Sequence, residues 1–146
     1  MKAKSIKIAI LAMGGEGGGV LADWIIDLAE SNHYIAQLTS VPGVAQRTGA
    51  TIYYLEIYPR AGIVDAAHEP ELALMPVPGD VDIVIASELM EAGRAIQRGL
   101  ITPDRTTLVA SINRVFSMTE KVAMADGRVS EEKLIDACRS DRKSVV

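Results

Sequence analysis

Residues 5–25 read SIKIAILAMGGEGGGVLADWI, and this stretch decides the fold. Its first nine residues form a short, isoleucine-rich apolar run, which is typical of a strand buried on both faces of a parallel sheet. Glycines at positions 14, 15, 17, 18 and 19 then interrupt the run. From Val20 onward, apolar residues recur at helical spacing, whereas Asp23, Asp27 and Glu30 fall on the other side. The stretch therefore predicts a strand, a glycine turn and an amphipathic helix.

The rest of the chain continues this alternation of strands and helices. Further strands are expected at residues 33–39, 50–58, 81–86 and 106–112, and we interpret residues 115–124 as extended. One predicted helix has Ser87 as its N-cap and ends at Gly99, and another is capped by Ser130. Alternating strands and helices predict an α/β protein, a three-layer Rossmann-like domain whose mostly parallel sheet is covered on both faces.

Length and composition narrow the classes of protein that this chain can represent. The 146 residues fit one domain, with 49% apolar and 23% charged residues, as in soluble globular proteins. A net charge of −4 disfavours a nucleic-acid partner. The apolar run from Ile8 to Gly15 is too short to span a membrane. Because Cys138 is the one cysteine, this chain's thiolates alone cannot form a disulfide or hold an iron–sulfur cluster or a structural zinc. A cytoplasmic location follows.

The C-terminus and the middle of the chain depart from a regular α/β pattern. The chain stops at residues 144–146 (SVV), an apolar ending without a cap or a polar tail, so we expect residues 1–146 to be one domain that is incomplete at its C-terminus. Apolar surface left uncovered there predicts self-association. Residues 61–92 contain seven acids and no Lys or Arg, which predicts a solvated acidic face. Four of the six prolines fall within residues 59–78, an irregular excursion that we interpret as a flap or a partner-binding arm.

The glycine turn is the first candidate site. It lies at the carboxyl end of the first strand and opens a helix, where backbone amides and the helix dipole favour an anion. The spacing of Gly17, Gly19 and Ala22 meets a relaxed dinucleotide pattern, but residues 37–40 (QLTS) lack the acid that would hold a ribose. Contact with a phosphate or with a partner's cofactor remains open. So does a purely structural role, in which the glycines allow a tight turn and close packing of the helix.

The second candidate is the loop at residues 40–49, SVPGVAQRTG, at the carboxyl end of the second predicted strand. Arg47 supplies a forked cation suited to a phosphate or a carboxylate, and Gln46 can both donate and accept hydrogen bonds. The alternative is that Arg47 ties its loop to the acidic stretch. Two loops with ligand-binding character are thus expected at one edge of the sheet.

The other side chains that could carry chemistry are interpreted as structural residues. His33 and His68 are isolated and are interpreted as surface or packing residues. Cys138 lies on the apolar side of its predicted helix and is interpreted as a core residue. Trp24, flanked by apolar residues, is interpreted as core, with a partner contact as the alternative. No catalytic residue set and no metal pair is recognised in the sequence.

Together, these segments resemble a known family. The turn MGGEGGGVLADWI, the segment SVPGVAQRTGATIYYLEIYP and the later PVPGD before VDIVIA occur in the order typical of the gamma subunit or domain of 2-oxoacid:ferredoxin oxidoreductases. The chain most resembles the beta-subunit type of indolepyruvate oxidoreductase over nearly its whole length. Glu16 departs from the family pattern, which usually has Gln there. A carboxylate beside the glycine amides weakens anion binding at that spot.

The resemblance implies a non-catalytic subunit of an assembled enzyme. Thiamine diphosphate and iron–sulfur clusters would lie in a partner subunit or domain, which passes electrons to ferredoxin, and coenzyme A would take the acyl group. This chain alone would bind no cofactor. It would help to form the active-site and coenzyme A region, with Gly15, Gly17, Gly18 and Gly19 facing a cofactor and Gln46, Arg47 and Thr48 meeting substrate or partner. Two other classes stay open, namely a free-standing nucleotide- or phosphate-binding module and a structural interaction domain.

Overall fold

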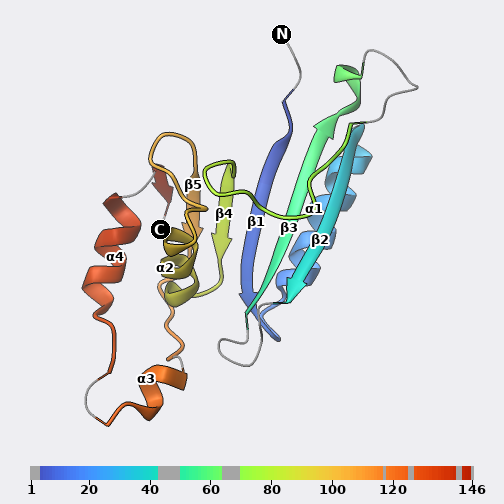
Figure 1. Cartoon of the computed structure of the whole chain (residues 1–146). Coiled ribbons are helices and arrows are strands. Elements are labelled where there is room, and N and C mark those ends of the chain that lie inside the picture. Colours follow the sequence, from blue (N-terminus) through green and yellow to red (C-terminus); the bar gives the residue numbers. More distant parts are fainter. Residues whose placement is uncertain are drawn as a thin grey trace.

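The computed structural model describes residues 4–42, 50–63, 70–116, 118–124, 127–140 and 143–145. Its six-stranded sheet has the order β2-β3-β1-β4-β5-β6, with helices on both faces (Figure 1). The strands are β1 (Ile6–Met13), β2 (Tyr34–Pro42), β3 (Ala50–Pro59), β4 (Ile83–Ala86), β5 (Thr107–Ala110) and β6 (Lys143–Val145). The helices are α1 (Gly18–Ser31), α2 (Leu89–Gln97), α3 (Met118–Val122), α4 (Glu131–Ser140) and a short 3-10 turn, η1 (Arg60–Gly62).

The sheet is mixed, because one strand runs against the others. β1, β4, β5 and β6 pair in parallel, whereas β3 is antiparallel to both of its neighbours, β1 and β2. The α/β class and the helices on both faces are confirmed, but the prediction of a mostly parallel sheet is partly wrong. The connection from Pro42 to Ala50 is shorter than the dozen or so residues that a parallel crossover needs, so β3 returns antiparallel beside β2.

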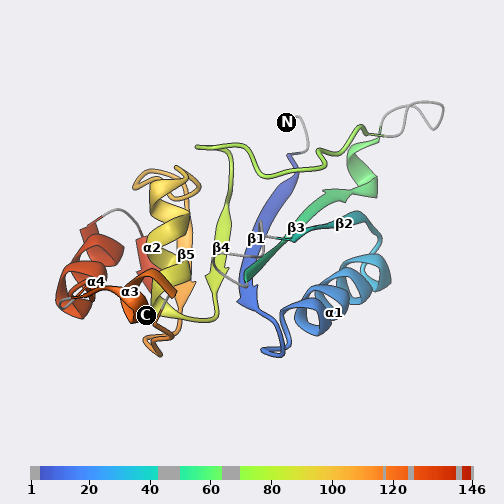
Figure 2. The same ribbon diagram turned by 60° about the horizontal axis from the view of Figure 1, so that its bottom comes forward.

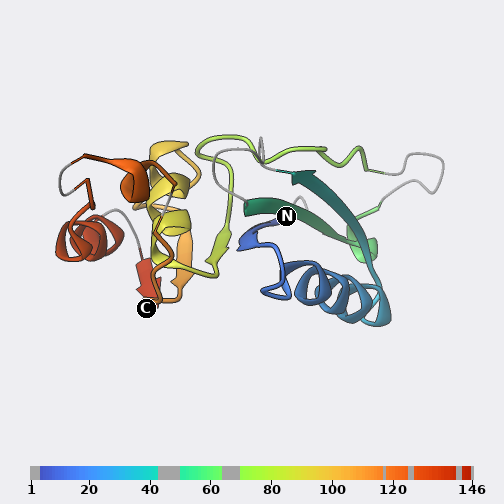
Figure 3. The ribbon, with the colours of Figure 1, turned by 90° about the horizontal axis from the view of Figure 1, so that it is seen from below.

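Helix α1 covers one face of the sheet over β1, β2 and β3 (Figure 3). The buried residues of the helix, Gly18, Ala22 and Ala29, are small, and Leu21, Ile25 and Ile26 lie half-buried against the same core. They pack with a core made of Ile8, Ile10, Ala12, Leu55 and Ile57. Trp24 is 67% exposed, so its interpretation as a core residue is wrong. The small residues bring the helix close to the strands, and the large side chain of Trp24 lies outside this contact.

The opposite face carries the larger core beneath α2 and α4. Alternate residues of β1 and β4 point into it because side chains of a strand alternate between faces. Its buried members include Ala9, Leu11, Val84, Leu89, Leu108 and Cys138. Cys138 is 2% exposed, which confirms its interpretation as a core residue. No described helix is both long and apolar enough to cross a membrane.

The proline-rich excursion returns across the same face as residues 70–79, which we call the strap (Figure 2). The backbone N–H of Ala73 donates to Oε2 of Glu56 at 2.7 Å, and the side-chain amide of Gln37 donates to the carbonyl of Ala73 at 3.0 Å. The hydroxyl of Thr39 donates to the carbonyl of Leu74 at 2.8 Å. The described half of the excursion is therefore bound to β2 and β3, while residues 64–69 lie outside the described part.

Two local predictions are wrong, and one is confirmed. Glu88, not Ser87, caps α2, because its carboxylate accepts hydrogen bonds from the backbone N–H groups of Met90 and Glu91 at 2.9 and 2.8 Å. Within residues 115–124, expected to be extended, Met118–Val122 forms the short helix α3. The predicted cap of α4 is confirmed, since Ser130 Oγ accepts from the backbone N–H of Lys133 at 3.5 Å.

Candidate functional site

The candidate site lies where β1 and β4 end side by side, an edge that we call the rim. β1 runs into the glycine turn and α1, and β4 runs into Ser87 and α2. Figure 1 shows both strands pointing to this lower edge of the sheet. In open α/β sheets, ligands bind outside the carboxyl ends of the strands. The rim therefore has the position of a ligand site.

The first half of the glycine turn has a backbone that only glycine adopts easily. Gly15 and Gly17 have φ angles of 87° and 76°, in the left-handed region. A side chain added at Gly14, Gly15 or Gly17 would meet no atom within 4 Å. Gly17 is also the N-cap of α1, and it provides no side-chain cap. This part of the turn leaves open space next to the N-terminus of a helix, where an anion is favoured.

Gly18 and Gly19 lie against the sheet. A Cβ atom on Gly18 would clash with the side chain of Ala12 and lie 3.0 Å from the ring of Tyr53. On Gly19 it would lie 3.4 Å from the same ring, an ordinary van der Waals distance. Gly18 therefore allows α1 to pack closely on β1 and β3. The structural alternative for the glycine turn accounts for the lack of a side chain at Gly18, whereas the part of Gly18 and Gly19 in cofactor binding stays a prediction.

A carboxylate belonging to the protein sits beside the turn. Oε2 of Glu16 accepts a hydrogen bond from the backbone N–H of Met13 at 3.0 Å and another from the hydroxyl of Ser87. The two strand ends are thus joined through Glu16. Because a negative group already stands next to the uncapped helix, it opposes a second anion at the same spot. A phosphate would have to displace Glu16 or bind farther along the turn.

The ends of the loop at residues 43–49 lie at the rim, but the loop itself lies outside the described residues. In the sheet register, Pro42 pairs with Thr51, and Ala50 pairs with Met13, the last residue of β1. The loop is therefore anchored beside the glycine turn. The proposed contacts of Gln46, Arg47 and Thr48 stay predictions, as does the alternative that Arg47 ties the loop to acidic residues. His68 also lies outside the described residues, whereas His33 is exposed.

Sequence reasoning missed the role of Glu88, which is 1% exposed. Besides capping α2, its carboxylate accepts from the backbone N–H of Val115 at 3.3 Å. Three backbone amides thus hold this buried acid, and the backbone N–H of Leu89 in turn donates to the carbonyl of Asn113 at 2.8 Å. Glu88 ties α2 to the segment that follows β5. The local sequence pointed to Ser87 instead, because Ser is a preferred N-cap residue and Glu is not.

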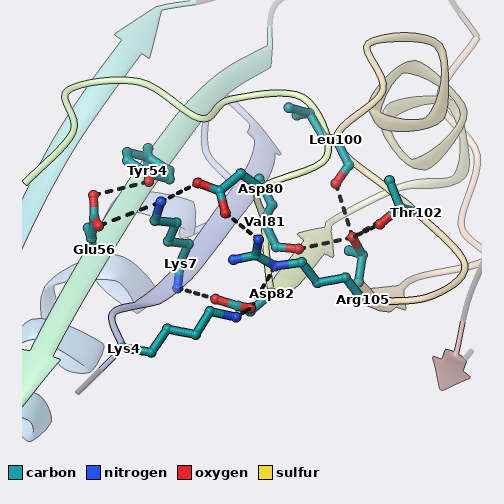
Figure 4. A network of polar contacts seen from close by, with 11 residues as sticks. Lys4, Lys7, Tyr54, Glu56, Asp80, Val81, Asp82, Leu100, Thr102 and Arg105 are labelled. Atoms are coloured by element: carbon teal, nitrogen blue, oxygen red, sulfur yellow. Dashed lines mark hydrogen bonds and ion pairs between the residues drawn. The ribbon is translucent and has the colours of Figure 1, made fainter. Parts of the chain in front are cut away.

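At the opposite edge, the amino ends of the same strands carry a dense network of charges (Figure 4). We call Lys4, Lys7, Asp80, Asp82 and Arg105 the amino-end network. Lys7 and Arg105 both pair with Asp80, and Arg105 Nε donates to Asp82 at 2.9 Å. The Lys4 ammonium lies 3.3 Å from Asp82. Each carboxylate therefore meets two cations, and these residues link the start of β1 to the starts of β4 and β5.

Mutual pairing shifts the titration of this network. The hydrogen bonds from Lys7 and Arg105 hold the pKa of Asp80 below its usual range, although burial opposes the shift. Burial alone would raise the pKa of Asp82, but hydrogen bonds from Arg105, the Lys7 backbone and Lys4 reverse the direction and lower it. The same two aspartates raise the pKa of Arg105. The carboxylates stay charged because their partners favour the ionised form.

The acidic stretch is not one solvated face, as the sequence suggested. Asp80 and Asp82 are paired in the amino-end network, and Glu88 and Glu91 are 1% and 2% exposed. Burial raises the pKa of Glu91, and its partner Arg94 opposes this shift. In the described residues, no group of three or more His, Cys, Asp or Glu side chains is arranged to hold a metal ion. Within residues 61–92, packing and pairing thus account for four of the seven acids.

Comparison with known proteins gives solved structures of similar fold. No family model matches the chain, and no curated protein matches it. The crystal structure of pyruvate oxidoreductase subunit PORC from Thermotoga maritima is similar, with a TM-score of 0.50 and 20% sequence identity. The match covers 77% of this chain and 53% of that subunit, so the chain spans about half of the subunit's length. At this identity the likeness establishes the α/β fold.

Proposed function

We propose that this chain is a non-catalytic, gamma-type subunit of a 2-oxoacid:ferredoxin oxidoreductase. The observation that carries the proposal concerns two sequence segments typical of this family, the glycine turn and residues 43–49. The glycine turn and the residues that flank 43–49, Pro42 and Ala50, lie at one rim. That rim belongs to a sheet whose fold is similar to a pyruvate oxidoreductase subunit. A fold alone does not determine function, so the position of the two segments is the stronger argument.

The choice of 2-oxoacid rests on narrower grounds. The sequence resembles the indolepyruvate type, whereas the similar structure is named as a pyruvate oxidoreductase subunit. We propose indolepyruvate as the first substrate to test, with pyruvate as the direct comparison. Neither assignment follows from a contact in the described residues.

We propose that the rim meets a coenzyme A phosphate or a carboxylate of the partner subunit. Arg47 and the amides of Gly15, Gly17, Gly18 and Gly19 suit an anion, and Gln46 and Thr48 add polar contacts. Glu16 opposes an anion directly at the turn, so Arg47 would carry the main attraction. Thiamine diphosphate and the iron–sulfur clusters would be bound by the partner, where they supply decarboxylation and electron transfer to ferredoxin.

The assembled enzyme gives the direct test. The tagged chain is purified from its native source, and the copurifying subunits are identified by mass spectrometry and assayed for thiamine and iron. We expect coenzyme A-dependent reduction of a viologen dye with indolepyruvate or pyruvate. The chain purified alone should be colourless and inactive. Iron–sulfur absorbance from the isolated chain, or a complex without thiamine, would contradict the proposal.

A free-standing nucleotide- or phosphate-binding module is the second candidate, favoured by the open, uncapped N-terminus of α1. Calorimetric titration of the isolated chain with ADP, NAD and inorganic phosphate separates the two. Micromolar binding in the absence of any partner supports the module. Binding that appears only in the assembled complex supports the subunit.

The sheet face opposite α2 gives a physical basis for the predicted self-association of the isolated chain. Ile83 and Ile85 are half-buried on this face, and Val109 is 41% exposed. In the described residues no helix covers this face over β5 (Figure 3). We propose that isolated chains form dimers or larger species through it. Light scattering that shows a monodisperse monomer at high concentration would contradict this.

A further inference from the structure

One flank of α1 carries large apolar side chains that the described residues leave uncovered. Val20, Trp24 and Leu28 are 53%, 67% and 65% exposed. They are spaced four residues apart, so they form a stripe along one side of the helix. Single exposed apolar residues are ordinary in soluble proteins, but a contiguous group indicates a surface that another molecule covers.

The stripe continues into a groove between α1 and the sheet. The groove has a volume of about 430 Å³, and its lining includes Ile6, Ile25, Leu28 and Ile57. Leu28 belongs to both features, and Ile6, at the start of β1, is 40% exposed. We call the stripe and the groove together the α1 apolar surface. It combines protruding side chains with a hollow beside them, as a specific protein interface does.

The core beneath α1 does not include the stripe residues Val20, Trp24 and Leu28. The contact of α1 with the sheet is made by the buried Gly18, Ala22 and Ala29, and by the half-buried Leu21, Ile25 and Ile26. The large apolar residues of the stripe lie outside that contact, where water meets them. Their exposure therefore calls for an explanation other than the stability of this chain.

Charge indicates the kind of partner. Asp23, Asp27 and Glu30 are exposed on α1 directly beside the stripe, and no ion pair to them occurs in the described residues. No Lys or Arg occurs from residue 8 to residue 46. The apolar surface is thus bordered by an acidic edge without a compensating cation on the same helix.

A second copy of this chain fits such a surface poorly. If two copies of α1 packed around a twofold axis, the same patch would meet itself, and the acidic edges would face each other. Like charges brought together at an interface are unfavourable. A partner whose apolar patch is bordered by Lys or Arg would cover the stripe and pair with the acids at once.

We propose that the α1 apolar surface docks a different folded protein, which presents an apolar patch bordered by Lys or Arg. The inference goes beyond the proposed function, because it assigns the surface of contact. It rests on the proposed function only for the identity of the partner, the thiamine-bearing subunit. Self-association through the face of β4 and β5 is a separate contact.

The test uses matched variants in the complex purified from the native source. Leu28→Glu places a charge on the surface, and Val122→Glu is the control, because Val122 is 69% exposed on α3, far from α1 (Figure 1). We expect Leu28→Glu to weaken partner binding at least a hundredfold and Val122→Glu to leave it unchanged. Circular dichroism and thermal unfolding should show both variants folded, because both positions are exposed.

Charge reversal and a probe at Trp24 sharpen the test. The double variant Asp23→Lys/Asp27→Lys should weaken binding to the partner about tenfold and reduce its dependence on salt. Trp24 is the chain's one tryptophan, so 5-fluorotryptophan incorporated here gives a single fluorine signal. This signal should shift when purified partner is added, and it should not change with the concentration of the isolated chain.

The outcomes separate this inference from the proposed function. A partner that lacks thiamine but is lost in Leu28→Glu supports the docking surface and contradicts the assigned activity. A thiamine-bearing complex that survives Leu28→Glu contradicts the docking surface alone. A chain that purifies without any partner overturns the inference. So does a homodimer that Leu28→Glu breaks and that Asp23→Lys/Asp27→Lys strengthens.

Discussion

The two edges of the parallel strands differ in how their polar groups are paired. At the amino ends, Lys7, Asp80, Asp82 and Arg105 pair with one another around the starts of β1, β4 and β5. At the rim, the glycine turn has open space around its first glycines, and a single carboxylate, Glu16, bridges to the next strand end. At the amino ends, the charged side chains pair with one another. At the rim, backbone groups of the glycine turn face open space.

The difference indicates which edge stabilises the fold and which is available for a ligand or a partner. Charged groups that already pair with each other are not available to a ligand. Removing one of them leaves its partner without a counter-charge. A turn with left-handed glycines and an uncapped helix keeps donors accessible. Substitutions at the amino ends should therefore lower stability, whereas most substitutions at the rim should affect binding.

The largest expected effect on stability is at Gly18, the rim position where close packing requires a glycine. Gly18→Ala should lower the free energy of unfolding by about 3 kcal/mol, because the new Cβ would clash with Ala12 and crowd Tyr53. Gly14→Ala is the matched control, since its Cβ would meet no atom within 4 Å, and it should cost less than about 0.5 kcal/mol. Chemical denaturation measures both. Equal losses would contradict the division of the glycines into packing and turn residues.

The next effect tests the amino-end network. Arg105→Met should lower the free energy of unfolding by about 1 to 3 kcal/mol, because Asp80 and Asp82 each lose a charged hydrogen bond. Lys133→Met, at an exposed position on α4, should change it by less than about 0.5 kcal/mol. Denaturant unfolding at neutral pH gives both numbers. If Arg105→Met were as stable as the parent chain, the network would be a surface feature of little consequence.

The stability that Arg105 contributes should depend on pH, in a direction set by the pKa shifts of Asp80 and Asp82. The pKa values of Asp80 and Asp82 are lowered in the folded state, so their contribution is complete above the unfolded value of about 3.9. It is lost as the pH falls through the lower folded values. The stability difference between the parent chain and Arg105→Met should be constant from pH 7 to about pH 5 and shrink below about pH 4. If the stability difference grew as the pH fell, the pKa values of the two aspartates would be raised in the folded state, not lowered.

The smallest effect on stability is expected at Glu16. Glu16→Gln keeps an acceptor for Met13 and Ser87, so the free energy of unfolding should change by no more than about 0.5 kcal/mol. Removal of the negative charge should tighten binding of inorganic phosphate at the rim several-fold, because the carboxylate no longer repels it. Ser87→Ala, which keeps the charge, is the control for phosphate titrations followed by NMR. Unchanged phosphate shifts in Glu16→Gln would place the anion site elsewhere.

Sequence patterns predicted the elements better than they predicted which residues face which neighbour. The strand at residues 5–13 and the helix after Ser130 are confirmed nearly to their ends. In α1, apolar residues cover a wide arc, and the pattern alone did not reveal which part of the arc meets the sheet. Ala22 and Ala29 do so together with Ile25 and Ile26, and Trp24 is left exposed.

Non-local pairing explains the other differences. The short connection after β2 favours an antiparallel β3, but the insertion of β3 between β1 and β2 depends on long-range pairing that no local pattern encodes. The amino-end network joins Lys7 to Asp80 and Asp82 to Arg105, residues far apart in the sequence, so composition suggested an acidic face instead. The rim was predictable because strand–turn–helix units place their carboxyl ends at one edge.

The most direct measurement compares the two edges in one assembled enzyme. Steady-state turnover, with coenzyme A varied, is measured beside thermal unfolding for Gln46→Ala/Arg47→Ala at the rim and for Arg105→Met at the amino ends. The account predicts that the rim variant loses turnover or coenzyme A affinity about ten- to hundredfold while its stability changes by no more than about 0.5 kcal/mol. Arg105→Met should lose stability and keep turnover per folded complex. A rim variant with the kinetics of the parent enzyme would contradict the account, and one that unfolds early would assign Arg47 a structural role.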